Sequence, residues 1–177
     1  MDFNNFTISP ITIKDVQHYY LFVNENRKRI AEYFPLTTSS TTDCKKTRKF
    51  VKEKIKMRKA KAFYSFLIKD KSKVIGTIFL KNIDWKVLKS ECGYFIDHEY
   101  EGKGITSKAL KFITDFAFNE VGLNKLYLRI AEENIASKRV AEKNHFQVEG
   151  KLREDFKTSG GNYIDVLYYG LLKSQIS

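Results

Sequence analysis

The stretch YFIDHEYEGKGITSKALKFITDFAF, residues 94–118, decides both the fold and the site. It predicts a strand that runs out through Asp97, a turn at Gly102 and Gly104, and a helix that begins at about Ile105. Glycines at such a junction let the backbone approach a ligand closely. The first N–H groups of a helix have no partner inside it and carry partial positive charge. The junction therefore predicts a phosphate- or pyrophosphate-binding site.

The predicted donors of this site are backbone amides, with two lysines adding cationic reach. They are Gly102, Gly104, Ile105, Thr106, Lys103 and Lys108. A P-loop is excluded because Ile105 stands where that motif needs lysine. A dinucleotide fingerprint needs a third glycine at Ser107 and an earlier place in the sheet. The other interpretation is a tight turn with a purely structural role.

The rest of the chain predicts strands first and then alternating helices and strands. Before the stretch we expect an extended segment over 6–13 and then a helix over 14–34, broken near Asn26 and ended by Pro35. A polar loop over 36–43, with Thr42 or Asp43 as N-cap, leads into a helix over 44–60. A hairpin of 62–70 and 74–84 and a strand over 90–97 follow. From the stretch onward we expect a helix over 105–120, a strand over 125–131, a helix over 135–144, a strand near 146–153 and a strand over 162–172. This order predicts an α/β (α+β) fold with a mixed sheet and helices on its faces, in a single domain over 1–177.

Composition narrows the class of protein. The chain has 177 residues, of which 42% are hydrophobic and 14% aromatic, so a disordered chain is excluded. No run reaches the length of a transmembrane helix, and residues 1–20 lack a secretory pattern. Cys44 and Cys92 have no spacing typical of a disulfide framework or a metal site. We expect no metal and no membrane association, and a cytoplasmic location.

Charge adds a second feature. The net charge is +11, from 32 Lys+Arg against 21 Asp+Glu. The run KKTRKFVKEKIKMRKAK, residues 45–61, could dock on ribosomal RNA or guide an acidic peptide. The alternative is a solvated outer face whose Phe50, Val51 and Ile55 pack inward. The sequence favours the alternative, since the run lacks interleaved aromatics of the kind that stack on bases.

A second motif, ENIASKRVAEKNHF at 133–146, completes a pattern. Together with the glycine turn, it resembles the GNAT superfamily of acyl-CoA-dependent N-acetyltransferases, in which (Q/R)xxGx(G/A) opens one helix and NxxSxxxxxKxGF spans another. The likeness covers essentially the whole chain. Its nearest subgroup is the Rim-type enzymes, which acetylate N-terminal amines of ribosomal proteins. ECGYFIDHEYEGKGI, NIASKRVAEKNHF and DVLYYGLL carry that likeness. Three positions depart from the pattern: Glu101, Thr106 and His145.

The resemblance implies a mostly antiparallel sheet and acetyl-CoA as cosubstrate. It implies that the backbone of Tyr94, Phe95 and Ile96 pairs with the pantetheine arm, where an N–H polarises the thioester carbonyl. Glu91 is the implied catalytic base, and the alternative is a sheet-face carboxylate paired with a lysine such as Lys81. Glu154 and Asp155, expected on a loop before the last strand, are the reserve candidates.

Ser137 fits the family position of the acid near the sulfur, and Asn134 that of a ligand of the pantetheine amide. Asn134 is equally suited to a plain helix N-cap. Cys92 should face away from Glu91 into the core. His18, His98 and His145 have no motif partners and are expected on the surface or in turns.

The implied reaction is acetyl transfer to a primary amine, first a protein N-terminal α-amine such as that of a ribosomal protein. One alternative is a basic ribosome- or RNA-associated module without turnover. Another is acetylation of a small-molecule amine, among which polyamines and aminoglycosides rank low because the protein is itself cationic. A homodimer is implied only by the resemblance.

Overall fold

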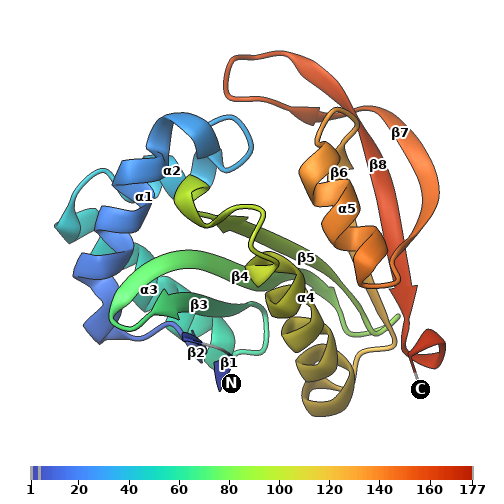
Figure 1. Ribbon diagram of the computed structural model, residues 1–177, viewed down its shortest axis with the longest axis horizontal. Helices are drawn as coiled ribbons and strands as arrows, with labels where there is room; N and C mark the ends of the chain where they lie inside the picture. The colour runs from blue at the N-terminus through green and yellow to red at the C-terminus, as the bar shows by residue number, and fades with distance from the viewer. Residues whose placement is uncertain (1, 4, 177) are drawn as a thin grey trace.

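The computed structural model describes residues 2–3 and 5–176, and it contains one eight-stranded sheet. The strands lie in the order β1-β2-β3-β4-β5-β6-β8-β7 (Figure 1). Their bounds are β1 Asp2–Phe3, β2 Phe6–Pro10, β3 Tyr64–Asp70, β4 Lys73–Asp84, β5 Lys89–Ile96, β6 Lys125–Ala131, β7 Gln147–Lys157 and β8 Tyr163–Leu172. Neighbouring strands run antiparallel except β5 and β6, which are parallel. The predicted mixed, mostly antiparallel sheet is confirmed.

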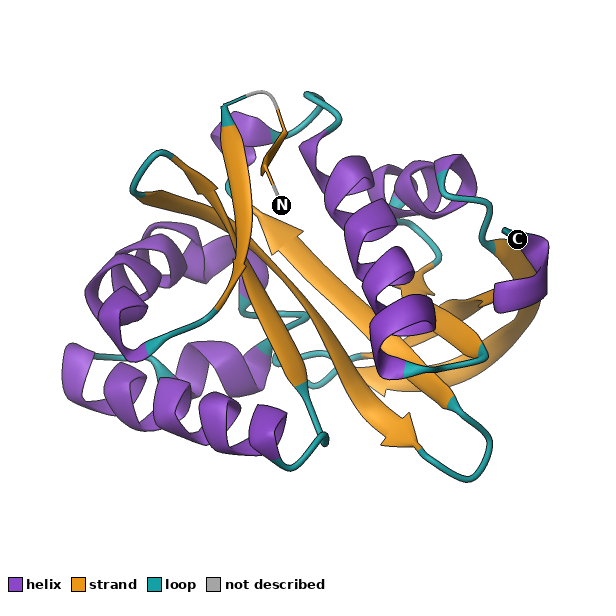
Figure 2. Ribbon diagram, turned by 90° about the horizontal axis from the view of Figure 1, so that it is seen from below, coloured by secondary structure: helices purple, strands orange, loops and turns teal. Residues whose placement is uncertain are grey.

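Helices cover both faces of this sheet (Figure 2). Helices α1 (Val16–Ile30) and α3 (Cys44–Lys59) pack on one face, with the short α2 (Pro35–Ser40) beside them. Helices α4 (Ile105–Asp115) and α5 (Ile135–Lys143) pack on the other. Strand alternation feeds the two cores: Leu67 joins the α1/α3 core, while its neighbours Phe66 and Ile68 join the α4/α5 core.

The segment between α1 and α3 differs from the prediction. Helix α1 runs unbroken past Asn26, whose side-chain amide donates to the carbonyl of Phe22 at 3.0 Å. It ends at Ile30, and Pro35 opens α2 instead of following a longer helix. The predicted polar loop over 36–43 is therefore wrong over residues 36–40, which are helical, whereas residues 41–43 connect α2 to α3 as predicted. Proline suits the first turn of a helix because its missing N–H has no helical partner there.

Two other expectations have clear outcomes. Asp43 is confirmed as the N-cap of α3, since its carboxylate accepts from the amide of Lys46 at 2.8 Å. Strand β7 continues past the predicted end to Lys157. Glu154 and Asp155 therefore lie in a strand and not on a loop. The register of β7 with β8 shifts between Leu152 and Phe156, which places Glu154 in a bulge with φ of 52°.

Helix α4 is the crossover between the two parallel strands. It continues as a π-helical turn over Phe116–Val121 and stops at Gly122, where φ is 82°. In the part of the chain that the structure describes, no helix is both long and apolar enough to cross a membrane.

Candidate active site

Strands β5 and β6 separate soon after they meet. They pair over three residues only, Lys89–Glu91 with Lys125–Tyr127. Beyond this point β5 stays paired with β4, and the amide of Asp97 donates to the carbonyl of Ile75 at 2.7 Å. Alternate residues of an antiparallel strand turn their backbone groups to opposite sides. The N–H and C=O groups of Cys92, Tyr94 and Ile96 therefore point into the gap.

The backbone of Phe95 does not share this position. By the same alternation it pairs with Thr77 of β4, and its ring stacks on Phe22 at 5.1 Å in the α1/α3 core. Of the three residues predicted to present backbone groups to a ligand, Tyr94 and Ile96 face the gap. The carbonyl of Ile96 already accepts a hydrogen bond from Arg29.

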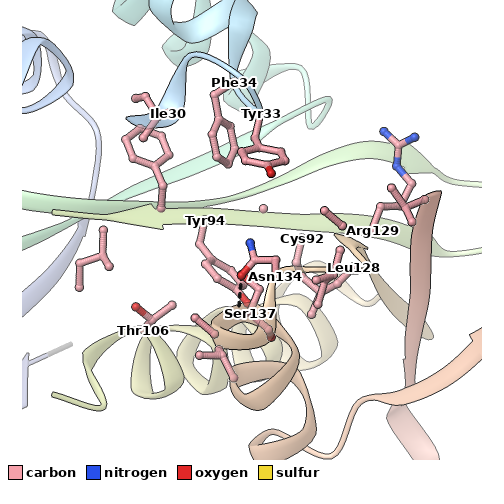
Figure 3. A pocket seen from close by; sticks show the side chains of 18 of the residues that line it. Ile30, Tyr33, Phe34, Cys92, Tyr94, Thr106, Leu128, Arg129, Asn134 and Ser137 are labelled. Atoms are coloured by element: carbon pink, nitrogen blue, oxygen red, sulfur yellow. Dashed lines mark hydrogen bonds between the residues drawn. The ribbon is translucent and has the colours of Figure 1, made fainter. Parts of the chain in front are cut away.

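The gap opens into a cavity of about 510 Å³, a size typical of small-molecule sites. The cavity passes through the sheet (Figure 3). Tyr33 and Phe34 line it from the side of α1 and α2, whereas Thr106, Asn134 and Ser137 line it from the side of α4 and α5. Such a cavity can admit two molecules from opposite faces and bring them together at the gap.

The start of α4 forms one wall. Gly102 and Gly104 have φ of 72° and 73°, a backbone conformation that glycine adopts without strain. Gly104 is the N-cap and makes no side-chain cap hydrogen bond, so the first amides of α4 keep their donors. Gly102 and Thr106 line the cavity. The side chain of Ile105 is buried in the core, which leaves only its amide for a ligand.

Cations surround this helix start. Lys103 is exposed, and its ammonium lies 4.9 Å from the ring centre of Tyr100. Lys108 is exposed one turn into α4. Glu101, the acid that departs from the family pattern, forms an ion pair with Arg29 at 2.5 Å. Arg29 comes from α1 and thereby balances the carboxylate of Glu101 beside the glycine turn.

The start of α5 forms the next wall. The Asn134 side chain accepts from the amide of Ser137 at 3.0 Å, so the predicted N-cap is confirmed. The hydroxyl of Tyr94 donates to the carbonyl of Ser137 at 3.4 Å. Burial raises the pKa of Tyr94 to about 12, and this side chain therefore stays protonated at neutral pH. Asn134, Ser137 and Tyr94 thus form one connected group below β5 (Figure 3).

Glu91 faces the opposite side of the sheet. It is buried, accepts from the side-chain amide of Asn82 at 2.9 Å, and pairs with Lys81 at 3.0 Å and Arg129 at 3.4 Å. The lysine partner anticipated as an alternative is therefore present. Both oxygens of Glu91 are oriented at the point where β5 and β6 part.

The reserve acids differ in position. Asp155 pairs with Arg129 at 3.1 Å and so joins the Glu91 network from its exposed side. Glu154 is exposed, and its backbone amide donates to Asp165 at 2.9 Å. The adjacent Phe156 lines the cavity.

Cys92 is confirmed as a core residue. It is 2% exposed and packs in the α4/α5 core, on the face opposite Glu91. Burial raises the pKa of its thiol.

His98 and His145 are exposed, and His145 takes φ of 65° in the turn after α5. His18 is exposed as well. Within residues 2–3 and 5–176, no group of three or more His, Cys, Asp or Glu side chains is placed to hold a metal ion.

Sequence reasoning did not identify the individual residues on the α1 side of the cavity. Arg29, Tyr33 and Phe34 come from a segment that carries no motif, and only the fold brings them to the site. The position of Arg129 could have been predicted from the alternation of apolar and polar residues in its strand. In KLYLRIA, residues 125–131, the apolar Leu126, Leu128 and Ile130 alternate with Tyr127 and Arg129, which places the latter two on the same face as Glu91.

Comparison with known proteins assigns the family. Residues 5–147 match the acetyltransferase (GNAT) domain. The chain belongs to the GNAT acetyltransferase family. Among curated relatives, this GNAT chain is 39% identical over 100 residues to the putative ribosomal N-acetyltransferase YdaF of Bacillus subtilis, a match that covers 56% of the chain and 54% of YdaF. It is 32% identical over 95 residues to spermidine N(1)-acetyltransferase of Escherichia coli K12, covering 54% and 51%. The GNAT chain thus spans about half the length of these two relatives.

Solved structures agree on the GNAT fold. The ribosomal-protein-S5-alanine acetyltransferase of Vibrio fischeri superposes with a TM-score of 0.93 at 20% identity, over 100% of this chain and 98% of that one. RimL, a ribosomal α-N-protein acetyltransferase in complex with coenzyme A, gives 0.89 at 21% identity over 96% and 94%.

Proposed function

We propose that this GNAT chain transfers an acetyl group from acetyl-CoA to a primary amine, first of all the N-terminal α-amine of a ribosomal protein. One observation carries the proposal. Glu91 and Ser137 lie on opposite faces of the sheet at a single gap, and the cavity connects them. An amine that enters from the α1 side would meet Glu91, while a thiol that leaves toward α5 would meet Ser137.

The residues present fit acetyl-CoA. The uncapped amides at Gly104, Ile105 and Thr106 suit a pyrophosphate, with Lys103 and Lys108 as nearby cations. The Arg29–Glu101 pair removes the charge conflict that Glu101 would otherwise create. Tyr94 and Ile96 offer backbone groups to the pantetheine arm in the manner of an added strand. Asn134 keeps its side-chain NH₂ for an amide carbonyl while its oxygen caps α5.

The bound thioester supplies an activated acyl carbon. Glu91 takes a proton from the amine as its nitrogen forms the new C–N bond, and Lys81 and Arg129 hold the carboxylate in position. A backbone N–H on the gap side of β5 stabilises the negative charge that develops on the carbonyl oxygen. When the C–S bond breaks, the Ser137 hydroxyl transfers its proton to the sulfur, which leaves as a thiol. Solvent returns a proton to Ser137 and takes up the one that Glu91 removed from the amine. One proton is lost from the amine and one is gained by the sulfur.

Several features support an α-amine as the acceptor. An α-amine has a pKa of about 7.7–8.0, whereas that of a lysine side chain is about 10.4, so a single carboxylate suffices to deprotonate it. Tyr33, Phe34 and Phe156 give the α1 side of the cavity an aromatic entrance that suits an extended peptide. The names of YdaF and RimL refer to ribosomal acceptors. A ribosomal acceptor would place the protein in the cytoplasm.

A second candidate function is acetylation of a polyamine. The match to spermidine N(1)-acetyltransferase favours it, and so do Glu91 and Glu133, the latter accepting from the Tyr33 hydroxyl at 3.4 Å. The net charge of +11 opposes it, because a polycation is repelled at long range. We rank it below the α-amine for that reason.

The test is acetyl transfer followed by mass spectrometry. The acceptors are ribosomal-protein N-terminal peptides, the same peptides with a blocked α-amine and one internal lysine, and spermidine. The expected result is one acetyl group on each free α-amine peptide. Glu91→Gln should lower kcat about a hundredfold with little change in KM for acetyl-CoA.

Asp155→Asn is the matched control, since it removes a carboxylate from the same Arg129 network. It should leave kcat within about threefold of the wild type. If Asp155→Asn is the variant that loses activity, the base has been assigned to the wrong residue. If spermidine alone is acetylated, the second candidate replaces the first. Transfer to none of the three acceptors contradicts the proposed reaction.

A further inference from the structure

Helix α3 holds most of the net charge of the protein. Over Cys44–Lys59 it carries nine Lys and Arg residues and a single acid, Glu53, for a net charge of +8. The whole chain has +11, so all other residues together contribute only +3. The charge is therefore concentrated on one helix of 16 residues.

These cations are not neutralised by the protein. Among residues 2–3 and 5–176, none of the nine takes part in an ion pair. Elsewhere pairing is frequent, as between Lys125 and Glu149 at 2.5 Å or Lys151 and Asp165 at 3.0 Å. Lys54 differs from the exposed cations, because its ammonium lies over the Phe63 ring at 3.9 Å from the ring centre.

The cations form a continuous exposed surface. Seven of the nine are exposed: Lys45, Lys46, Arg48, Lys49, Lys52, Lys56 and Lys59. Lys45, Lys49, Lys52, Lys56 and Lys59 follow one another at steps of three or four residues and so form a line along the helix, about 21 Å long at 1.5 Å per residue. The apolar residues Phe50, Val51 and Ile55 point the other way and pack in the α1/α3 core.

We propose that the exposed face of α3 is a docking surface for the phosphate backbone of double-stranded RNA. A uniform line of cations matches a uniformly charged polyanion. A membrane surface is the poorer partner, because an interfacial helix needs an exposed apolar face and α3 buries its own. A single-stranded nucleic acid is also poorer, because Phe50 stacks on Tyr19 at 5.9 Å and is not free to stack on a base. The choice of RNA over DNA rests on the proposed ribosomal acceptor.

Docking on α3 leaves the cavity accessible. The described residues that line the cavity come from α1 and the connection to α2, from β4, β5 and β6, from the start of α4, from α5 and from the β7/β8 pair, and none comes from α3. The protein could therefore hold an RNA duplex and acetyl-CoA at the same time. Such docking would raise the local concentration of the enzyme beside a peptide that emerges from an RNA-rich particle.

The test compares two variants of equal net charge. Lys49, Lys52 and Lys56 are replaced by Gln in one variant. In the control, three exposed lysines outside α3, Lys71, Lys86 and Lys143, are replaced by Gln. Binding to a short fluorescein-labelled RNA duplex is followed by anisotropy over a range of salt. The slope of log K against log salt should fall by about three in the α3 variant and stay near the wild-type value in the control. At low salt the Kd of the α3 variant should rise at least about tenfold.

Three results would overturn the docking surface. They are equal weakening in both variants, absence of salt-dependent RNA binding in the wild type, and tighter binding to a DNA duplex, polyglutamate or phosphatidylserine vesicles than to RNA. Acetyl-CoA binding is measured on the same samples by calorimetry. Because α3 lies outside the cavity, a protein that binds acetyl-CoA but not RNA contradicts this inference alone, and one that binds RNA but not acetyl-CoA contradicts the proposed function alone.

Discussion

Helices α4 and α5 both begin at the cavity, yet they begin in opposite ways. Helix α5 satisfies its own first turn, since Asn134 accepts from the amide of Ser137. Helix α4 begins on Gly104, which has no side chain to offer, and its first amides stay available. A cap stabilises a helix by about 1 kcal/mol. The difference teaches that α4 gives up this stabilisation at the place where a phosphate can supply it.

The largest effect is expected from a substitution that places a side chain at the uncapped start of α4. Gly104→Asp puts a carboxylate where the pyrophosphate is expected. Two charges about 4 Å apart near a protein surface interact with about 4 kcal/mol. The Kd of acetyl-CoA, measured by calorimetry, should rise at least about a hundredfold.

Gly161→Asp is the control for that variant. Gly161 also has a left-handed φ, of 91°, but it lies in the β7–β8 turn and does not line the cavity. Gly161→Asp imposes the same backbone strain and adds the same charge as Gly104→Asp, and it should leave the Kd of acetyl-CoA unchanged. Equal weakening in both variants would mean that the amides of α4 do not bind the cofactor.

The start of α1 extends the comparison, because its stabilising side chain, Asp15, is ionisable and its contribution to stability therefore depends on pH. The turn Ile13–Asp15 leads into α1, and the Asp15 carboxylate accepts from Thr12 and from Lys69 of β3 at 2.6 Å. Burial raises the pKa of Asp15, but these hydrogen bonds and the lysine charge outweigh it and hold the pKa below 3.8. A depressed folded-state pKa gives stability that is present above the unfolded pKa and is lost as pH falls.

Asp15→Asn should therefore lower the free energy of unfolding by about 2 kcal/mol at neutral pH. The deficit should shrink as pH drops below 3.8, where the wild type loses the same contribution. Urea unfolding at a series of pH values measures the deficit in unfolding free energy at neutral pH and its decrease at low pH. Asp115→Asn, at an exposed pair with Lys111, should change little. A deficit that does not vary with pH would contradict the ionic role of Asp15.

The smallest effect separates two roles of Asn134. Asn134→Ala should lower the free energy of unfolding by about 1 kcal/mol, because the α5 cap is lost. Asn134→Asp keeps a capping oxygen but removes the side-chain NH₂. It should retain stability while weakening acetyl-CoA several-fold. If Asp restores both stability and affinity, Asn134 acts only as a cap.

How far the sequence determines the site depends on the range of each contact. The glycine turn, the caps at Asp43 and Asn134 and the inward position of Cys92 follow from short-range rules, and the structure has all of them. The Arg29–Glu101 pair joins residues 72 apart, and no local pattern indicates it. The sequence therefore shows Glu101 as a departure from the family pattern but does not indicate the arginine that pairs with it.

The same distinction explains the errors in the fold. The segment PLTTSS is a poor helix former by composition. In the structure, the guanidinium of Arg27 reaches from α1 to the carbonyls of Thr38 and Thr41, which satisfies the end of α2. Strand β7 ran past its predicted end because bulges let it follow β8 despite an irregular pattern.

The three residue pairs that join β5 and β6 have a consequence for the ancestry of the molecule. The strands on one side of this seam, β1 to β5, all precede those on the other, β6 to β8, in the chain. The two walls of the cavity are thus encoded one after the other, and the chain crosses between them once, through α4. A recombination event near Gly122 would exchange one wall for another without cutting a strand. New pairings of the cavity residues that precede this point (Arg29 to Thr106) with those that follow it (Leu128 to Val166) are in this sense a single genetic step away.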